Sequence, residues 1–175
     1  MKVGHVHGRF QPFHKGHAKY VKWAFENCDQ LIVGVTNADP GHIEAEDADP
    51  ERHKQENNPY LYFERQRMIE SFLKSEKIRD SAQVTPFPIN RPELWEYYAP
   101  KDITHFIVVL EDWHREKAQR LRNKGRTVRT MDRNRQISAT EIRNKMRNNQ
   151  RWESDVPDAV AATIHSLDIE LPRHD

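Results

Sequence analysis

Apolar and polar positions along the chain form blocks that predict strands separated by helices. Residues 2–7 alternate loosely between apolar and polar and end at Gly8, whereas residues 31–36 form a continuous apolar run between polar neighbours. A continuous run of this length is typical of a strand buried on both faces. Between the two, apolar side chains recur at helical spacing with lysines opposite them, at Ala18, Val21, Ala24 and Phe25. The pattern therefore predicts a strand, a turn, a helix and a second strand.

The same alternation of strand and helix continues along the chain. Helical spacing of apolar residues predicts two further helices, at residues 60–76 and 114–124, the second ending at Gly125. A third apolar run predicts a strand at residues 105–111, and two shorter segments, at residues 82–87 and 127–130, predict two more. We expect an α/β fold in which about five parallel strands form one doubly wound sheet with helices on both faces. Because no linker marks a boundary, we expect a single domain over residues 1–175.

Two segments interrupt the alternation. Residues 37–59 contain seven acidic residues and no apolar periodicity, which predicts a long loop that acts as a lid or is only a tolerated insertion. Residues 86–98 are punctuated by prolines and contain Trp95. Both segments follow the carboxyl ends of predicted strands, and open parallel sheets bind their ligands at that edge.

Composition and charge narrow the classes of function. The formal net charge of the 175 residues is +1, which argues against a general nucleic-acid-binding protein. Residues 114–151 nevertheless hold 13 Lys and Arg against 3 Asp and Glu, which indicates either an anionic ligand or a solvated helix surface. Cys28 is the single cysteine, which excludes an internal disulfide and a multi-cysteine zinc site. The chain has no signal-peptide pattern and no membrane-spanning apolar run, so we expect it in the cytoplasm.

The segment GRFQPFHKGH lies where the first strand should give way to the first helix. Gly8 permits a sharp turn after the strand, and Gly16 permits a close approach of the backbone to a ligand. His14 and His17 share one face, since residues three apart are neighbours on a helix. On spacing alone, the two histidines can bind a metal, cap a turn or stabilise a phosphate as cations or hydrogen-bond donors. The glycines and Arg9 favour the phosphate site.

The segment RNRQISATEIRNKM carries a second candidate anion site. Ser138 followed by Glu141 forms a capping box, so a helix should begin there. The hydroxyls of Ser138 and Thr140, the first-turn amides, Arg135 and Arg143 can all approach one anion. A capping box alone fits an ordinary surface helix, but two cation-bearing helix starts in one parallel sheet indicate a clamp on a polyphosphate. No P-loop and no G-x-G-x-x-G pattern occurs, so neither a P-loop enzyme nor a dinucleotide redox domain is supported.

The paired segments GRFQPFHKGH and ISATEIR resemble the motifs of the H-x-G-H nucleotidyltransferase superfamily. Within it the chain looks most similar to the archaeal-type nicotinamide mononucleotide adenylyltransferases. The likeness extends over nearly the whole chain and includes NPYLYFER, PELWEYY and ISATEIRNKMRNNQRWESDVPDAV. The resemblance implies a Rossmann-like fold and the transfer of AMP from ATP to nicotinamide mononucleotide or a related phosphate monoester, giving NAD⁺ and pyrophosphate.

The resemblance also implies roles for individual residues. The transition state would be stabilised by His14, His17 and Arg143. The nucleotide would be held by Gly8, Arg9, Phe10, Gly16, Arg135, Ile137, Ser138 and Thr140, with Mg²⁺ bridging phosphate oxygens and no metal ligand from a protein side chain. The acceptor would be bound by Asn37, Arg65, Trp95 and Asp112. Trp95 would stack on the ring of the acceptor, although a tryptophan can equally belong to the core, and Arg65 would help to place a phosphate or a loop.

One departure from the archaeal pattern leaves the substrates open. In place of a Ser/Thr-Gly-Asn-Pro-like run the chain has Glu111, Asp112 and Trp113, which resemble an element of cytidylyltransferases that build CDP-linked alcohols. Asp112 can contact a hydroxyl of a ligand or cap the following helix. Two alternatives are therefore a cytidylyltransferase that transfers CMP from CTP to a small phosphate or phosphonate, and a non-catalytic nucleotide-sensing module. We expect ATP or CTP and a small phosphorylated acceptor as partners, no nucleic acid or membrane, and possible homo-oligomers as in archaeal-type relatives.

Overall fold

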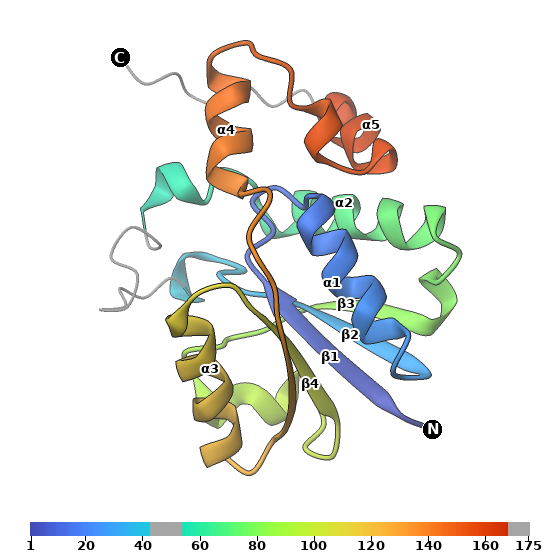
Figure 1. Ribbon diagram of the computed structural model, residues 1–175, viewed down its shortest axis with the longest axis vertical. Coiled ribbons are helices and arrows are strands. Elements are labelled where there is room, and N and C mark those ends of the chain that lie inside the picture. The colour runs from blue at the N-terminus through green and yellow to red at the C-terminus, as the bar shows by residue number, and fades with distance from the viewer. Residues whose placement is uncertain (43–53, 168–175) are drawn as a thin grey trace.

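A five-stranded parallel sheet forms the centre of the computed structural model, which describes residues 1–42 and 54–167 (Figure 1). Its strands are β1 (Val3–Gly8), β2 (Gln30–Val35), β3 (Ala82–Pro86), β4 (Thr104–Val109) and β5 (Thr127–Asp132). They lie in the order β3-β2-β1-β4-β5, and every neighbouring pair is parallel. The predicted α/β fold is confirmed, and each strand overlaps a segment for which the sequence predicts a strand.

The helices follow the strands in the predicted alternation. They are α1 (Lys15–Phe25), α2 (Tyr62–Ser75), α3 (Asp112–Asn123), α4 (Ala139–Arg147) and α5 (Asp158–Leu167). Gly125 follows α3 with a φ of 73°, which confirms it as the residue that ends this helix. The α5 helix was not predicted, and residues Pro92–Tyr97 form a short 3-10 helix within the proline-rich segment.

Apolar side chains form a core layer on each face of the sheet. Leu31 and Val33 of β2 belong to one layer, in which residues of α1, α2, α4 and α5 take part. Ile32, between them, belongs to the other layer, which α3 and the 3-10 helix cover. Successive residues of a strand point to opposite faces, so a continuous apolar run fits a strand covered on both sides. The doubly wound arrangement with helices on both faces is confirmed.

The strand order reverses at β1, the strand that follows the start of the chain. Its whole length pairs with β2, from Val3 opposite Gln30 to Gly8 opposite Val35. On its other side it pairs with β4, where His5 lies opposite His105. In a doubly wound sheet the crevice beyond the carboxyl ends of the strands at such a switch point is the preferred place for a ligand. The topology therefore places a candidate site at the ends of β1 and β4.

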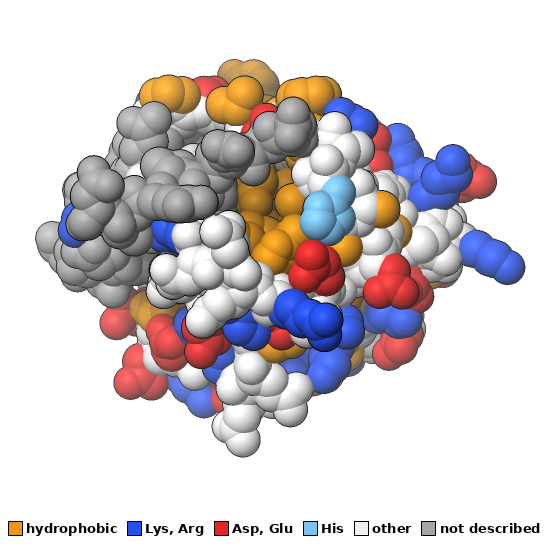
Figure 2. All heavy atoms as spheres, turned by 90° about the horizontal axis from the view of Figure 1, so that it is seen from above, with side chains coloured by type: hydrophobic (Ala, Val, Ile, Leu, Met, Phe, Trp, Pro, Cys, Tyr) orange, Lys and Arg blue, Asp and Glu red, His pale blue; other side chains and the backbone are white. Residues whose placement is uncertain are grey.

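None of the helices in the described part of the chain is both long and apolar enough to cross a membrane. Figure 2 shows one face on which acidic and basic side chains are interspersed; that nucleic acid is not a partner stays a prediction. Residues 43–53, which contain five of the seven acidic residues of the predicted loop, lie outside the described residues, so its role as a lid also stays a prediction.

Candidate active site

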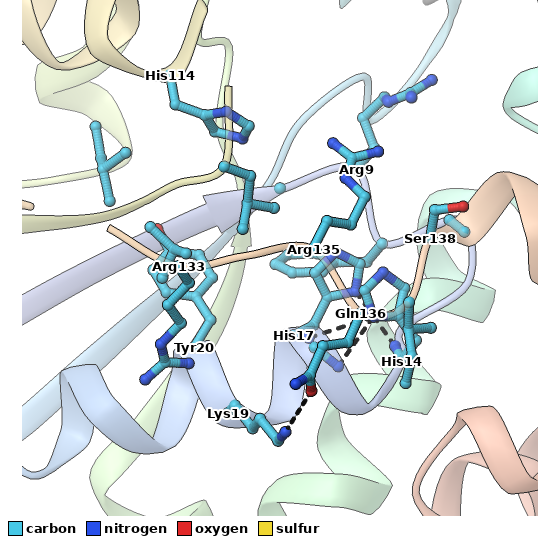
Figure 3. A pocket seen from close by; sticks show the side chains of 18 of the residues that line it. Arg9, His14, His17, Lys19, Tyr20, His114, Arg133, Arg135, Gln136 and Ser138 are labelled. Atoms are coloured by element: carbon cyan, nitrogen blue, oxygen red, sulfur yellow. Dashed lines mark hydrogen bonds between the residues drawn. The ribbon is translucent and has the colours of Figure 1, made fainter. Parts of the chain in front are cut away.

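A cavity of about 490 Å³ lies at the carboxyl ends of β1 and β4 (Figure 3). The described residues that line it come from the end of β1, the loop after it, the start of α1, the end of β4, the start of α3, residues 133–137 and the start of α4. Its volume falls in the range of about 300–1,000 Å³ that is usual for small-molecule sites. The two segments singled out in the sequence therefore meet around one cavity.

The cavity is lined by cationic side chains from four separate parts of the chain. They are Arg9, Lys19, Lys117, Arg133 and Arg135. Among the described residues that line it there is no Asp or Glu. Across the cavity, Lys19 Nζ donates to Gln136 Oε1 at 3.1 Å and so links α1 to the segment before α4 (Figure 3). This distribution of charge suits a polyanion such as a triphosphate.

His14 and His17 hold each other in place at the start of α1. His14 is the N-cap residue, and its Nδ1 accepts hydrogen bonds from the backbone N–H groups of Gly16 at 3.1 Å and His17 at 3.4 Å. In return, His17 Nδ1 accepts from the backbone N–H of His14 at 3.2 Å. The two rings are stacked, with centroids 3.6 Å apart. Because both Nδ1 atoms accept, each neutral ring carries its proton on Nε2, which leaves an Nε2–H donor for a ligand.

Burial keeps both of these imidazoles neutral. It is the largest cause lowering the pKa of His14 to about 3, with a smaller contribution from the charge of Arg135. Burial also lowers the pKa of His17 well below its usual value, helped by His14 and Arg9. Of the two forms that the sequence left open, cation and donor, the ligand-free site favours the neutral hydrogen-bond donor.

The two glycines of the first motif both line the cavity, but Gly8 does not make the turn that was expected of it. Gly8 stays in β1, and the left-handed residue of the following turn is Phe10, with a φ of 54°. A Cβ at Gly8 would lie 3.0 Å from the Phe10 ring, and one at Gly16 would lie 2.9 Å from Cε1 of His14. The sharp turn is thus not at Gly8. Gly16 leaves room for the His14 ring, and a close approach of its backbone to a ligand stays a prediction.

The capping box at the start of α4 is confirmed. Ser138 is the N-cap residue, its Oγ accepts from the backbone N–H of Glu141 at 3.2 Å, and Glu141 Oε2 accepts from the backbone N–H of Ser138 at 3.1 Å. Ser138 and Thr140 both line the cavity, as do Ile137 and Arg135. The start of α4 thus faces the same space as the start of α1, as the sequence predicted.

Arg143 does not line the cavity and is buried behind it, with 1% of its surface exposed. Its guanidinium donates to the backbone carbonyl of Gln11 at 2.7 Å, to Asn57 Oδ1 at 2.7 Å and to Thr140 Oγ1 at 3.2 Å. Burial lowers its pKa to about 10, which still leaves it charged near neutral pH. Arg143 thus fixes the start of α4 to the loop after β1, and its expected part in stabilising the transition state stays a prediction.

Arg65 has a similar role on the other side of that loop. Its guanidinium donates to the backbone carbonyls of Arg9 at 2.9 Å, Thr36 at 2.8 Å and Asn37 at 2.8 Å. The side chain is buried and lies outside the cavity lining. Of its two expected roles, placing a phosphate or a loop, the hydrogen bonds support the second.

The remaining acceptor candidates lie outside the cavity lining. Trp95 is 1% exposed, packs in the core layer under α3 and donates from Nε1 to the carbonyl of Pro88 at 3.0 Å. It cannot stack on an acceptor in this arrangement, because its faces are already covered. Asn37 follows β2 with a φ of 51°, and Asp112 is the first residue of α3, where the N-cap is Glu111. Neither is among the lining residues.

Several lining side chains are absent from the predicted set. They are Lys19, Trp113, His114, Lys117 and Gln136. At the start of α3 the rings of Trp113 and His114 stack with centroids 3.7 Å apart, and Lys117 Nζ lies 4.5 Å from the Trp113 ring centroid. Arg135 also pairs with Glu111 at 2.9 Å. The rule that ligands bind beyond strand ends would have found the Trp113 group, because it directly follows β4.

Comparison with known proteins agrees with this geometry. The model of the cytidylyltransferase-like family matches residues 6–145, which include the start of α1, the start of α4 and the strands between them. The chain belongs to the cytidylyltransferase-like family. The resemblance to nucleotidyltransferases drawn from the two motifs is therefore confirmed, and nucleotidyl transfer is the activity that membership of this family supports.

Named relatives within the family differ in the nucleotide they transfer. The phosphonoformate cytidylyltransferase of Streptomyces viridochromogenes is 36% identical over 171 residues, covering 96% of this chain and 93% of that protein. The nicotinamide-nucleotide adenylyltransferase of Thermoplasma acidophilum is 31% identical over 163 residues, covering 92% and 84%. That of Thermococcus kodakarensis is 32% identical over 171 residues, covering 95% and 84%.

A solved structure shares the fold of the present chain. The bifunctional NMN adenylyltransferase/ADP ribose pyrophosphatase of Francisella tularensis superposes with a TM-score of 0.70 at 19% identity. The match covers 97% of this chain and 51% of the other, so the chain spans about half the length of that protein. The likeness confirms the Rossmann-like fold.

Proposed function

We propose that the protein transfers CMP from CTP to a small phosphonate or phosphate acceptor and releases pyrophosphate. The observation that carries this choice is the 36% identity with a phosphonoformate cytidylyltransferase over nearly the full length of both chains. The buried position of Trp95 removes one expected contact with a nicotinamide ring. The sequence favoured AMP transfer, so this choice revises that preference.

In the proposed reaction the positively charged cavity holds the triphosphate between the two helix starts. An oxygen of the acceptor forms a bond to the α-phosphorus, the bond from that phosphorus to the bridging β-oxygen breaks, and pyrophosphate leaves. Such transfers depend on positioning and charge stabilisation more than on a covalent nucleophile. The Nε2–H groups of His14 and His17 would donate to phosphate oxygens as charge develops, and Arg9, Lys19 and Arg135 would bind the leaving pyrophosphate.

The base would occupy the other end of the cavity, beside α3. Leu110 and Trp113 supply apolar and aromatic surface there, and His114 and Lys117 add polar groups. Aromatic side chains bind flat heterocycles through stacking.

Mg²⁺ fits this site only through the nucleotide. The described lining offers no carboxylate, and oxygen ligands are what Mg²⁺ requires. The ion would therefore be held by phosphate oxygens and water, and would neutralise part of the charge of the triphosphate. The chain's own residues would bind the resulting complex through its remaining phosphate oxygens.

A second candidate is the transfer of AMP from ATP to nicotinamide mononucleotide. It is favoured by the nicotinamide-nucleotide adenylyltransferases, which are 31% and 32% identical to this chain over most of its length. Both reactions need the same clamp on a triphosphate, so the geometry around His14 and His17 supports either.

One matrix of reactions separates these possibilities. CTP and ATP are each incubated with Mg²⁺ and with phosphonoformate, phosphate monoesters or nicotinamide mononucleotide, and pyrophosphate release and products are measured by phosphorus NMR. We expect turnover with CTP and phosphonoformate or a small phosphate. Formation of NAD⁺ from ATP and nicotinamide mononucleotide, with no turnover of CTP, would replace the first proposal by the second. Nucleotide binding without pyrophosphate release in any mixture would indicate a nucleotide-sensing module and refute both.

A further inference from the structure

Three histidines meet in the core layer beneath the cavity, on the α3 side of the sheet. His5 and His7 lie two residues apart on β1 and so share a face, and His105 lies opposite His5 on β4. Their exposed fractions are 0%, 5% and 0%. One ring nitrogen from each can be chosen so that all three lie within 4.8 Å of one another. We refer to these three residues as the histidine cluster.

Hydrogen bonding within the histidine cluster is incomplete. Nδ1 of His5 and Nδ1 of His105 are 3.0 Å apart, which is a hydrogen bond only if one of the two carries a proton there. The Nε2 atoms of both rings are buried and have no hydrogen-bond partner. In the neutral pair, one of these Nε2 atoms is therefore a buried lone pair and the other a buried N–H. Buried polar atoms without partners are rare, and an ion or an ordered water is the usual explanation.

The surroundings of the histidine cluster include one aromatic ring and one cation. The Phe87 ring centroid lies 4.4 Å from that of His5 and 6.2 Å from that of His105. Arg126 is close enough for its charge to act on His5 and His105. Arg126 donates to the backbone carbonyls of Ala99 and Pro100, at 3.3 and 2.6 Å. Its charge also works against a cation in the cluster, which limits the affinity.

We propose that His5, His7 and His105 bind one divalent transition-metal ion of the zinc class. Three imidazoles without a thiolate or carboxylate are a donor set for Zn²⁺, Cu²⁺, Ni²⁺ or Co²⁺ and not for Mg²⁺. Tetrahedral coordination at about 2.0–2.1 Å requires modest ring adjustments to bring the three nitrogens to similar separations. Since His7 also lines the cavity, the fourth position can be filled from that side by water. This site is separate from the Mg²⁺ that would enter with the triphosphate.

The test uses the full chain without nucleotide and Co²⁺ as a spectroscopic probe. Metal-stripped protein is titrated with Co²⁺, and the visible d–d absorption, the bound metal after desalting and the melting temperature are measured. We expect one ion per chain, an absorption of four-coordinate intensity, a raised melting temperature, displacement by Zn²⁺ and no displacement by excess Mg²⁺. Wild-type protein that binds no Co²⁺, or that loses it to Mg²⁺, would overturn the proposal.

Variants assign the ion to the histidine cluster. His105→Phe should weaken Co²⁺ binding by more than the roughly 10–100-fold expected for loss of an outer-shell partner, and His7→Asn provides a second variant if the first does not fold. His17→Ala should bind Co²⁺ as wild type does, because the proposal assigns no ligand to the His14 and His17 pair. Unchanged binding in both cluster variants, or its loss in His17→Ala alone, would contradict the assignment. None of these measurements depends on nucleotidyl transfer, so their outcome is independent of the proposed function.

Discussion

Substitution of Gly16 by alanine tests whether the position of the His14 ring controls the rate of catalysis. An added Cβ would lie 2.9 Å from Cε1 and 3.0 Å from Nδ1 of His14. Carbon atoms in van der Waals contact normally lie about 3.5–4.0 Å apart, so the ring has to move by roughly half an ångström to one ångström. The stacked His17 ring, whose centroid is 3.6 Å away, then loses part of its support.

The expected effect of Gly16→Ala on rate is large, and its effect on stability is small. A misplacement of about 1 Å near the reacting groups can cost about 100-fold in rate, which corresponds to about 2.7 kcal/mol of barrier. In contrast, alanine is favoured over glycine in a helix by up to about 1 kcal/mol. Loss of the His14 cap costs about the same. The free energy of unfolding should therefore change by less than about 1 kcal/mol.

A double-mutant cycle with His14→Ala separates this cause from a general loss of structure. Initial rates of pyrophosphate release and urea unfolding curves are measured for wild type, both single variants and the double variant. Once the His14 ring is absent, the added methyl group has nothing to displace. The double variant should therefore turn over at the rate of His14→Ala and be slightly more stable than His14→Ala. A wild-type rate in Gly16→Ala, or losses that multiply in the double variant, would refute the reasoning.

Three further predictions concern residues around the same cavity. Because burial lowers the pKa of His14 to about 3 from an unfolded value of about 6.5, the unfolded chain binds the extra proton. The contribution of neutral His14 to the free energy of unfolding is therefore present above about pH 6.5 and is lost as the pH falls, by about 1.4 kcal/mol between about pH 7.5 and 5.5. Asparagine can cap the helix without titrating, so the free energy of unfolding of His14→Asn, measured in urea, should fall by that much less over the same pH range. Ser138→Ala should lower stability by about 1 kcal/mol and raise the KM for CTP, measured in initial rates. Arg143→Leu leaves buried acceptors unpaired and should cost about 2–4 kcal/mol; a change below about 0.5 kcal/mol would contradict its positioning role.

The sheet and the two clamp helices were predictable because their signals are local. A buried parallel strand must be apolar on both faces, so residues 31–36 show it directly. The capping box at Ser138 is a contact between residues three apart, and the sequence contains both partners. The α5 helix has comparable signals, with Pro157 before Asp158 and small apolar residues after it, although the sequence analysis predicts no helix there.

The position of large polar and aromatic side chains was not predictable in the same way. Arg65 donates to the backbone carbonyl of Asn37, 28 residues away, and Arg143 donates to that of Gln11, 132 residues away. The spacing of residues along one helix does not reveal such distant contacts. Trp95 follows β3 near the ligand-binding edge, but its ring turns into the core layer beneath α3. The histidine cluster depends on the register of β1 with β4, which only the sheet order defines.

The most direct test of whether the start of α1 stabilises nucleotidyl transfer compares wild type with His17→Ala. Pyrophosphate release is measured for both proteins, and CTP binding is measured by calorimetry on the same samples. His17 lines the cavity and its pKa is lowered by burial, so its neutral ring would act as a donor to the triphosphate. Loss of such a donor costs about 100–1,000-fold in kcat. We predict that His17→Ala loses about 100–1,000-fold in kcat, while its affinity for CTP falls by less than about tenfold. Full turnover in His17→Ala, with the acceptor that the wild type uses, would contradict the account.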